Sequence, residues 1–329
     1  MRNPRQNRVC FLLGIHRRSG TNFLYRLLTD HPDCHGGPIG EDFLVHHLDS
    51  LKQFVDSVKG SWNPEWREHT ASDEGDTFEH CMGDAIEEFL LAVARSDASA
   101  EQNELQGTQG AQRLLLAKTP SFGGLALFSD FLPQAPLLLL VRDGRAVVES
   151  GMRSFGWSFE AAARDWAAAA RALFAKQDAD GDASHTMLVK YEDLVRDVET
   201  TLASVFAFLG LDSDPYDQER AAGLGVIGSS DLARSGDVHW DAVPKADAFD
   251  PLHRFAEWSP AQHQRFNWIA GSEMERLGYS LMATGPLSVG QRLGHRARDG
   301  WWTLRVLLRT SSDFLARVPE RLRRLLHGD

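Results

Sequence analysis

Residues 9–28, VCFLLGIHRRSGTNFLYRLL, decide the fold because a strand pattern, a turn and a helix pattern follow one another there. The apolar run 9–13 fits a buried parallel strand. A glycine-containing turn follows, and apolar side chains then recur at helical spacing, with Thr21 or Asn22 available to cap the helix. Backbone N–H groups at such a helix start point into one concavity at the positive end of the helix dipole. The stretch therefore predicts a site for an anion such as phosphate.

Length and composition indicate an ordinary globular protein. The 329 residues are 43% hydrophobic, enough for a full-sized core in one large domain or two smaller ones. The formal net charge of -11 argues against general nucleic-acid binding, which needs a basic face. Cys10, Cys34 and Cys81 lack metal-ligand spacing, so we expect reduced thiols and a cytoplasmic location. The N-terminal apolar run is too short for a signal peptide, and no segment reaches the length of a membrane span.

Three more apolar runs, at 114–117, 137–141 and 187–189, predict further strands. Amphipathic patterns lie between them, so the chain is predicted to be a three-layer α/β fold with a central parallel sheet. Lys118 and Arg142 directly follow two of these strands. They are expected at the carboxyl edge of the sheet, where ligands of such folds bind.

Several connecting segments are rich in turn-forming or polar residues. Segment 30–38 predicts a loop that delivers Glu41, and 60–76 is expected to be irregular. The stretch 95–112 is predicted to be a mobile loop. Residues 212–251 lose all periodicity, which favours a long loop that is functional or disordered.

The chain changes character near residue 285. Residues 1–284 are predicted to form one domain, with a loop-rich insertion at about 53–112, whereas residues 285–329 form a basic tail. The tail has nine Lys and Arg against four Asp and Glu, and from Trp301 onward its apolar residues alternate with arginines in one or two amphipathic helices. Such helices fit packing against the body, self-association with a second copy, or peripheral contact with an anionic membrane, and all three stay open.

The opening turn departs from the usual ATP-binding motif. It has no Gly-Lys-Ser/Thr, and Arg18 stands two residues before Gly20 instead. A kinase needs that lysine at the transferred phosphate and the hydroxyl on magnesium, so a kinase-like phosphotransferase is disfavoured and is kept as an alternative. The second alternative is not an enzyme but a scaffold protein that binds a nucleotide without catalysis.

Arg18-Ser19-Gly20-Thr21 resembles the 5'-phosphosulfate-binding loop of sulfotransferases that use 3'-phosphoadenosine 5'-phosphosulfate, and in particular their bacterial and tyrosylprotein-type branch. The segment 142–150, RDGRAVVES, is similar to the second signature of that family, in which Arg142 and Ser150 would hold the 3'-phosphate. Further landmarks extend the resemblance over roughly residues 8–280; they are Lys118-Thr119-Pro120, Tyr191-Glu192-Asp193-Leu194 and Leu277-Gly278-Tyr279.

The resemblance implies transfer of a sulfuryl group to a hydroxyl or amine of a carbohydrate, lipid, peptide or small-metabolite acceptor, with release of adenosine 3',5'-bisphosphate and no metal. Arg18 would neutralise the leaving phosphate, and Lys118 would be a second cation near the sulfuryl group. Glu41 matches the catalytic carboxylate of the tyrosylprotein enzymes, while His16, His46 and His47 stay open as alternative bases. The implied nucleotide-binding residues are Arg17, Arg18, Ser19, Gly20, Thr21, Asn22, Arg142 and Ser150.

The second signature poses a geometric problem. In a helix that begins near Asp143, Ser150 lies two turns along, about 12 Å from the entrance. Arg142 and Ser150 can therefore meet one phosphate only if the end of the strand curls back toward the helix. Arginine suits such a contact because its planar fork meets phosphate oxygens in a bidentate manner.

Overall fold

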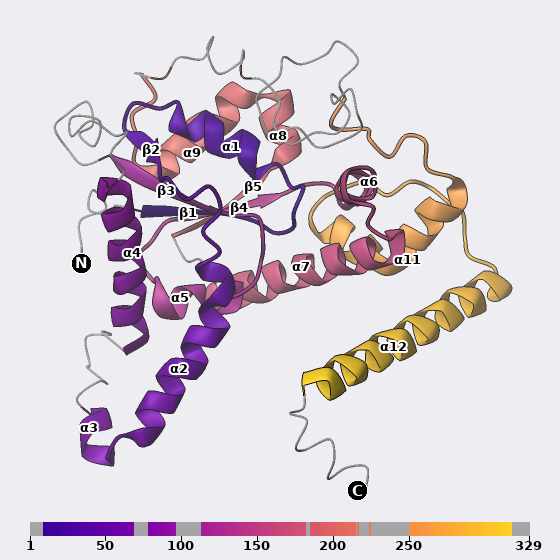
Figure 1. Ribbon diagram of the computed structural model, residues 1–329. Coiled ribbons are helices and arrows are strands. Elements are labelled where there is room, and N and C mark those ends of the chain that lie inside the picture. The colour runs from indigo at the N-terminus through magenta and orange to yellow at the C-terminus, as the bar shows by residue number, and fades with distance from the viewer. Residues whose placement is uncertain are drawn as a thin grey trace, which may run out of the picture.

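The computed structural model describes residues 9–68, 78–96, 113–181, 185–214, 216, 224 and 250–317. A five-stranded sheet in the order β2-β3-β1-β4-β5 lies at the centre, and every neighbouring pair of strands is parallel (Figure 1). Strand β1, which carries the opening stretch, is the central strand. The strands are β1 Val9–Gly14, β2 Cys34–Gly36, β3 Leu114–Thr119, β4 Leu137–Val141 and β5 Thr186–Lys190.

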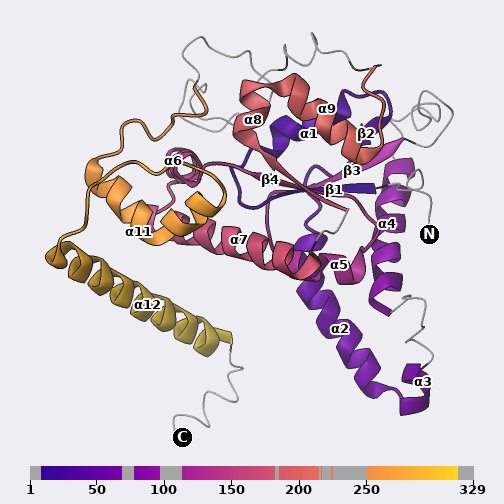
Figure 2. The same cartoon turned by 180° about the vertical axis from the view of Figure 1, so that it is seen from behind.

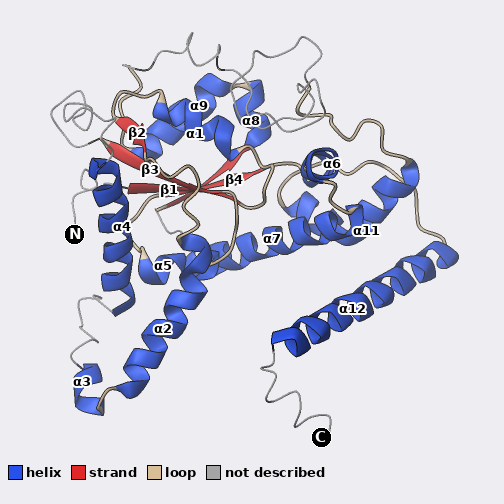
Figure 3. Cartoon of the chain, viewed as in Figure 1, coloured by secondary structure: helices blue, strands red, loops and turns tan. Residues whose placement is uncertain are grey.

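Helices cover both faces of the sheet, as Figures 2 and 3 show from opposite sides. One face is covered by α1 Thr21–Thr29, α8 Tyr191–Arg196 and α9 Val198–Leu209. The other face is covered by α4 Phe78–Ser96, α5 Phe128–Phe131, α6 Gly144–Phe155, α7 Phe159–Asp180 and α11 Pro260–Arg276. Helices α2 Leu48–Ser61 and α3 Pro64–Glu68 extend away from the sheet, and α12 Val289–Arg317 lies outside α7 and α11.

The strands alternate between two hydrophobic cores. In β1, Phe11 and Leu13 join the core under α7 and α11, whereas Cys10 and Leu12 join the core under α1 and α9. Because both faces are buried, the strands are continuous apolar runs. The prediction of a three-layer α/β fold with a parallel sheet is confirmed.

Two loop predictions were wrong. Residues 34–36, inside the predicted loop 30–38, form the edge strand β2, which pairs with residues 114–116 of β3. Three residues without apolar alternation do not predict a strand by themselves. They form one because their backbone pairs with β3. Residues 64–68, inside the stretch 60–76 that was expected to be irregular, form the short helix α3.

Other boundaries follow the sequence closely. Helix α9 begins at Val198 and ends before Gly210, which adopts the left-handed conformation with φ 69°. The helix of the tail begins at Val289, earlier than the start predicted near Trp301. Gly290, Gly294 and Gly300 lower the helix propensity of this segment, so its sequence did not indicate a helix. Among the described residues, no helix is both long and apolar enough to cross a membrane. Most of 212–251, nearly all of 95–112 and all of 318–329 lie outside the described residues.

Candidate functional site

The residues predicted to carry the chemistry meet at the carboxyl edge of the sheet. Parallel strands all end at the same edge, so the residues that follow them are brought together. Loop 15–20 follows β1, Lys118 is the penultimate residue of β3, Arg142 follows β4 and Tyr191 follows β5. Glu41 lies five residues beyond the end of β2.

Helix α1 begins without a side-chain cap. Its N-cap is Gly20, in the left-handed conformation with φ 99°, so the expectation that Thr21 or Asn22 caps the helix was wrong. Asn22 instead accepts a hydrogen bond from the Nζ of Lys118. Within the described residues, the backbone N–H groups of Gly20, Thr21 and Asn22 donate to no protein group. Three N–H groups at the positive end of a helix make an anion site.

Loop 15–20 is held in a tight conformation. The Ser19 hydroxyl donates to the His16 carbonyl at 2.7 Å and accepts from the His16 N–H at 3.3 Å. A Cβ on Gly20 would lie 2.4 Å from the Tyr191 ring, so only glycine fits there. Arg18 has a φ of 72°, a strained value for a residue with a side chain. Such strain persists where the surroundings impose it, as at binding sites.

Arg18 links the two signature motifs. Its Nε donates to the Ser150 hydroxyl at 2.9 Å, and its carbonyl accepts from the Nη1 of Arg142 at 3.0 Å. Arg142 and Ser150 are thus linked indirectly, through the backbone carbonyl and the side chain of Arg18. The Arg142 guanidinium also donates to the Pro251 carbonyl and lies 4.4 Å from the Tyr191 ring centroid. Its Nε is buried and has no hydrogen-bond partner in the described structure.

Three polar side chains hold the end of β4 in place; they are those of Trp166, Glu192 and Tyr279. The Trp166 indole donates to the Arg142 carbonyl at 3.2 Å. The Glu192 carboxylate accepts from the Asp143 N–H at 2.9 Å and from the Tyr279 hydroxyl at 2.8 Å. Burial, reinforced by the charge of Glu192, raises the pKa of Tyr279, so the phenol stays a donor. The sequence landmarks at 191–194 and 277–279 thus support the end of β4.

Lys118 forms a second cluster with Asn22 and Glu41. Its side chain is only 8% exposed, and its Nζ lies 3.9 Å from a carboxylate oxygen of Glu41 and 5.1 Å from the Tyr25 ring centroid. Burial lowers the pKa of Lys118, and the charges of Glu41 and Asp42 oppose that shift. Glu41 is 37% exposed, so its carboxylate is open to an entering molecule while it lies beside a cation.

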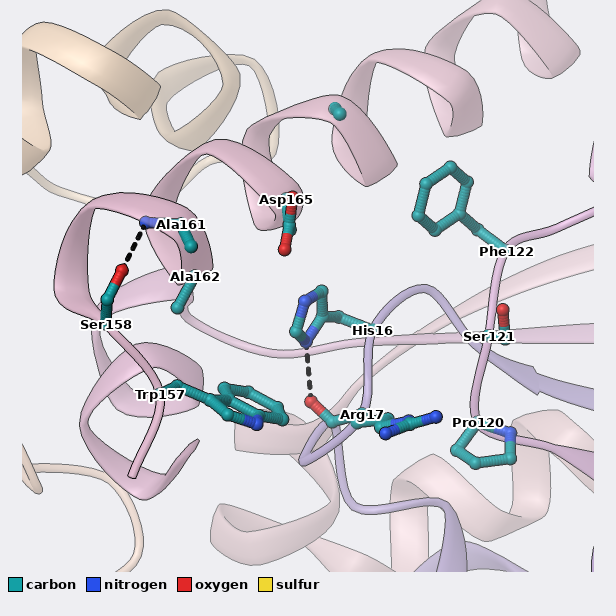
Figure 4. Close-up of a pocket in the computed structure, with 11 residues that line it drawn as sticks. His16, Arg17, Pro120, Ser121, Phe122, Trp157, Ser158, Ala161, Ala162 and Asp165 are labelled. Carbon is teal, nitrogen blue, oxygen red and sulfur yellow. Dashed lines mark hydrogen bonds between the residues drawn. The ribbon is translucent and has the colours of Figure 1, made fainter. Parts of the chain in front are cut away.

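A cleft of about 380 Å³ opens beside loop 15–20 (Figure 4). The Nδ1 of His16 lies 2.8 Å from the Arg17 carbonyl, which can only accept, so Nδ1 carries the proton and Nε2 is left as an acceptor. Burial lowers the pKa of His16, and the ring is therefore neutral near pH 7. The cleft is lined by His16, Arg17, Pro120, Ser121, Phe122, Trp157, Ser158, Ala161, Ala162, Asp165 and Ala168.

The model of the sulfotransferase family matches residues 10–215, the part of the chain that contains the sheet and both signature motifs. The chain belongs to the sulfotransferase family. It is similar to protein-tyrosine sulfotransferase 1 of Danio rerio, with 24% identity over 288 residues that cover 84% of this chain and 74% of that protein. Protein-tyrosine sulfotransferase 2 of Gallus gallus is 25% identical over 289 residues, which cover 84% and 71%. The solved sulfotransferase domain of the Synechococcus PCC 7002 olefin synthase is 21% identical, and the match covers 83% of this chain and 96% of that domain with a TM-score of 0.44.

This sulfotransferase is therefore an enzyme of sulfuryl transfer. Most of its predicted site residues fall into the two clusters, one of Arg18, Arg142 and Ser150 and one of Lys118, Asn22 and Glu41. Arg17, predicted with the nucleotide-binding residues, lines the cleft. His46 does not line it, and its Nδ1 lies 2.6 Å from the Ser121 hydroxyl.

Sequence reasoning missed the stacking of Arg142 on Tyr191 and the cleft itself. In the sequence Tyr191 belongs to the segment Tyr191-Glu192-Asp193-Leu194, and only its position directly after β5 indicates that it reaches the site. The cleft joins loop 15–20 to Trp157 and α7, which lie about 140 residues further along the chain. No local pattern signals that meeting.

Proposed function

We propose that this sulfotransferase takes its sulfuryl group from 3'-phosphoadenosine 5'-phosphosulfate and passes it to a hydroxyl or amine of an acceptor bound in the cleft beside His16. The cluster of Arg18, Ser150 and Arg142 carries the strongest support for this donor. It sets an arginine-rich anion site beside the anion site at the start of α1, as a donor with two separate phosphate groups requires.

The residues present fit that donor. The N–H groups of Gly20, Thr21 and Asn22 and the side chain of Arg18 would hold the 5'-phosphosulfate. Arg142 and Ser150 would hold the 3'-phosphate, and the buried Nε of Arg142, which lacks a protein partner in the described structure, would gain one. A site for ATP and magnesium would need a lysine and a hydroxyl directly after the glycine, where Thr21 and Asn22 stand.

In the transfer itself, the acceptor oxygen or nitrogen forms a bond to sulfur while the bond from sulfur to the bridging oxygen breaks. The electron pair of the broken bond goes to the 5'-phosphate of the released adenosine 3',5'-bisphosphate. Arg18, Lys118 and the N–H groups at the start of α1 stabilise that charge, so catalysis rests on position and electrostatics. A sulfuryl group carries less charge than a phosphoryl group, and we infer that no metal is needed.

A base must take the acceptor's proton, and we propose Glu41 for that role. Its carboxylate is partly exposed and lies beside Lys118, the cation proposed to face the sulfuryl group. His16 is the alternative because its neutral ring keeps Nε2 as an acceptor in the lining of the cleft. The two candidates can be distinguished by substituting each one and measuring which variant loses turnover.

The lining of the cleft favours an acceptor with a flat or apolar body. Trp157, Phe122 and Pro120 offer apolar surface, and Asp165 and Ser121 add polar groups to the lining. The relatives named above are protein-tyrosine sulfotransferases, whose names specify a phenolic acceptor in a peptide. A phenol in a peptide or small metabolite is therefore the first acceptor class to test, ahead of carbohydrates and lipids.

A sulfate-transfer screen tests this function. The full-length chain is incubated with donor labelled in its sulfuryl group and with tyrosine peptides, small phenols, sugars or lipids, with and without EDTA. We expect labelled product with at least one phenolic acceptor and equal rates in EDTA. Phosphate transfer from ATP with magnesium, and no sulfate transfer to any acceptor, would instead support a kinase-like phosphotransferase. Nucleotide binding without transfer of either group would support a scaffold.

A further inference from the structure

Helix α12 docks on the body through its polar side. Its Asp299 carboxylate accepts from the Arg265 guanidinium at 2.7 Å and from the Trp268 indole at 2.8 Å, both on α11. Asp299 also pairs with Arg164 of α7 at 2.5 Å. His295 is buried, and its ring stacks on Trp268 with centroids 5.1 Å apart. Charged and hydrogen-bonding groups therefore attach this helix, where an ordinary surface helix would use its apolar face.

The apolar side of α12 points the other way. Trp302 also faces the body, since its ring centroid lies 5.5 Å from the Arg164 guanidinium. At 100° per residue, His295, Asp299 and Trp302 fall within about 60° of one another. An apolar stripe lies opposite them and spans about 120°. Its members are all exposed; they are Val289 at 75%, Leu293 at 60%, Trp301 at 66%, Leu304 at 48%, Leu307 at 58% and Leu308 at 61%. Among the described residues, this apolar stripe therefore does not pack against the body, which was one of the three alternatives for the tail.

Arginines flank the apolar stripe on both sides. By the same projection, Arg292 and Arg296 lie along one margin and Arg298 and Arg305 along the other, and all four are exposed. Between residues 289 and 308 the only acidic residue is Asp299, which is turned toward the body. The outward side of this part of α12 is therefore apolar in the middle and cationic at both edges.

We propose that α12 lies on an anionic lipid membrane, with the apolar stripe at the boundary of headgroups and acyl chains and the two rows of arginine beside lipid phosphates. An anionic surface complements both rows at once. In a pair of such helices from two copies of the chain, the arginine rows would come close to one another, and like charges would oppose the contact. Trp301 suits the membrane interface because its indole combines a large apolar surface with a polar N–H group. The polar docking leaves the body attached above the membrane.

Vesicle flotation tests the proposal with the full-length chain. Vesicles of phosphatidylcholine containing phosphatidylserine are compared with vesicles of phosphatidylcholine alone. We expect the chain to float with the anionic vesicles and to stay largely unbound with the neutral ones. Each exposed arginine near the surface is worth about fivefold in binding, so Arg298→Gln with Arg305→Gln should weaken binding by about 25-fold, and added salt should weaken it too.

A matched pair of variants separates the apolar stripe from hydrophobicity in general. Leu304→Ser with Leu308→Ser removes two exposed apolar residues from α12, and Phe54→Ser with Phe89→Ser removes two of similar exposure from α2 and α4. We expect the first pair to lower binding at least about tenfold and the second to leave it unchanged. Sulfate transfer to a soluble acceptor serves as the folding control, because neither pair touches the two site clusters.

Several outcomes would overturn the proposal. Equal recovery of the parent and of the Leu304→Ser, Leu308→Ser variant from anionic vesicles would remove the apolar stripe as the contact. Equal binding to neutral and anionic vesicles would remove the role of the arginines. No flotation, together with a concentration-dependent dimer that the same variant abolishes in sedimentation, would show that a second copy of the chain covers the stripe.

Discussion

Glu41 and His16 compete for one role, and single substitutions distinguish them. Glu41→Gln keeps the shape of the side chain and removes its basicity, so turnover should fall by about 10²- to 10⁴-fold. Binding of adenosine 3',5'-bisphosphate should not change, because the carboxylate is not among the proposed nucleotide contacts. The measurement is steady-state kcat, together with calorimetry for binding. His16→Gln serves as the counterpart. If it abolishes turnover while Glu41→Gln leaves kcat intact, the histidine is the base.

Lys118 makes a prediction about pH. Because burial lowers its pKa, the ammonium group loses its proton at a lower pH than an ordinary lysine does. If its charge stabilises the transferring group, kcat/KM should fall as the pH rises through that lowered pKa. Arginine keeps its charge throughout this range. Lys118→Arg should therefore lower the maximal rate, but the pH at which kcat/KM falls on the alkaline side should be higher than in the parent. An alkaline limb at the same pH in both proteins would show that Lys118 is not the titrating group.

At the scale of the element, loop 15–20 depends on a glycine. Gly20→Ala meets two costs: a left-handed backbone, worth about 1–2 kcal/mol, and a clash with the Tyr191 ring. Gly156→Ala is the control, since Gly156 is also left-handed but a Cβ there would meet no atom within 4 Å. We expect both variants to melt at a lower temperature and only Gly20→Ala to lose nucleotide affinity. Equal nucleotide affinity of the two variants would contradict a role for the loop in binding.

The docking of α12 depends on Asp299. Burial alone would raise the pKa of this carboxyl, but hydrogen bonds from Trp268, Arg265 and Arg164 outweigh burial and lower it. A carboxyl with a lowered pKa in the folded state stabilises the fold above its unfolded pKa, and this contribution is lost as the pH falls through the folded pKa. Docking should therefore loosen in acid below the usual range of aspartate.

Hydrogen exchange of α12 amides, compared with α11 in the same sample, measures this loosening. Asp299→Asn should raise exchange in α12 at neutral pH and make it less dependent on acidification. Asp178→Asn is the control, since Asp178 also pairs with an arginine of α11 but does not contact α12. Exchange in α12 that is the same in the parent and in Asp299→Asn would mean that other contacts hold the helix.

The limits of prediction can be seen in single elements. The apolar strands β1, β3 and β4 could be predicted because burial on both faces leaves a continuous apolar run. Strand β2 could not, because it exists only through pairing with β3. Asn22 looks like a helix cap in sequence, yet its side chain binds Lys118, 96 residues further along. The approach of Arg18 to Ser150 is likewise a tertiary contact that no local pattern encodes.

For the whole molecule, the signature motifs predicted the class of enzyme, and the family assignment confirms it. The cytoplasmic location stays a prediction from cysteine use, as does the membrane contact proposed for α12.

The central claim is that loop 15–20 and Arg142 together recognise a nucleotide phosphorylated at both its 3' and 5' positions. Calorimetry of the parent chain and of Arg142→Ala, with adenosine 3',5'-bisphosphate and with the nucleotide that lacks the 3'-phosphate, tests it most directly. Loss of a hydrogen bond to a charged group costs about 1.5–3 kcal/mol, or roughly 10- to 150-fold in affinity. We predict that the parent prefers the bisphosphate and that Arg142→Ala loses affinity for it by that factor while binding the simpler nucleotide as before. Equal affinity of the parent for the two nucleotides would contradict the account.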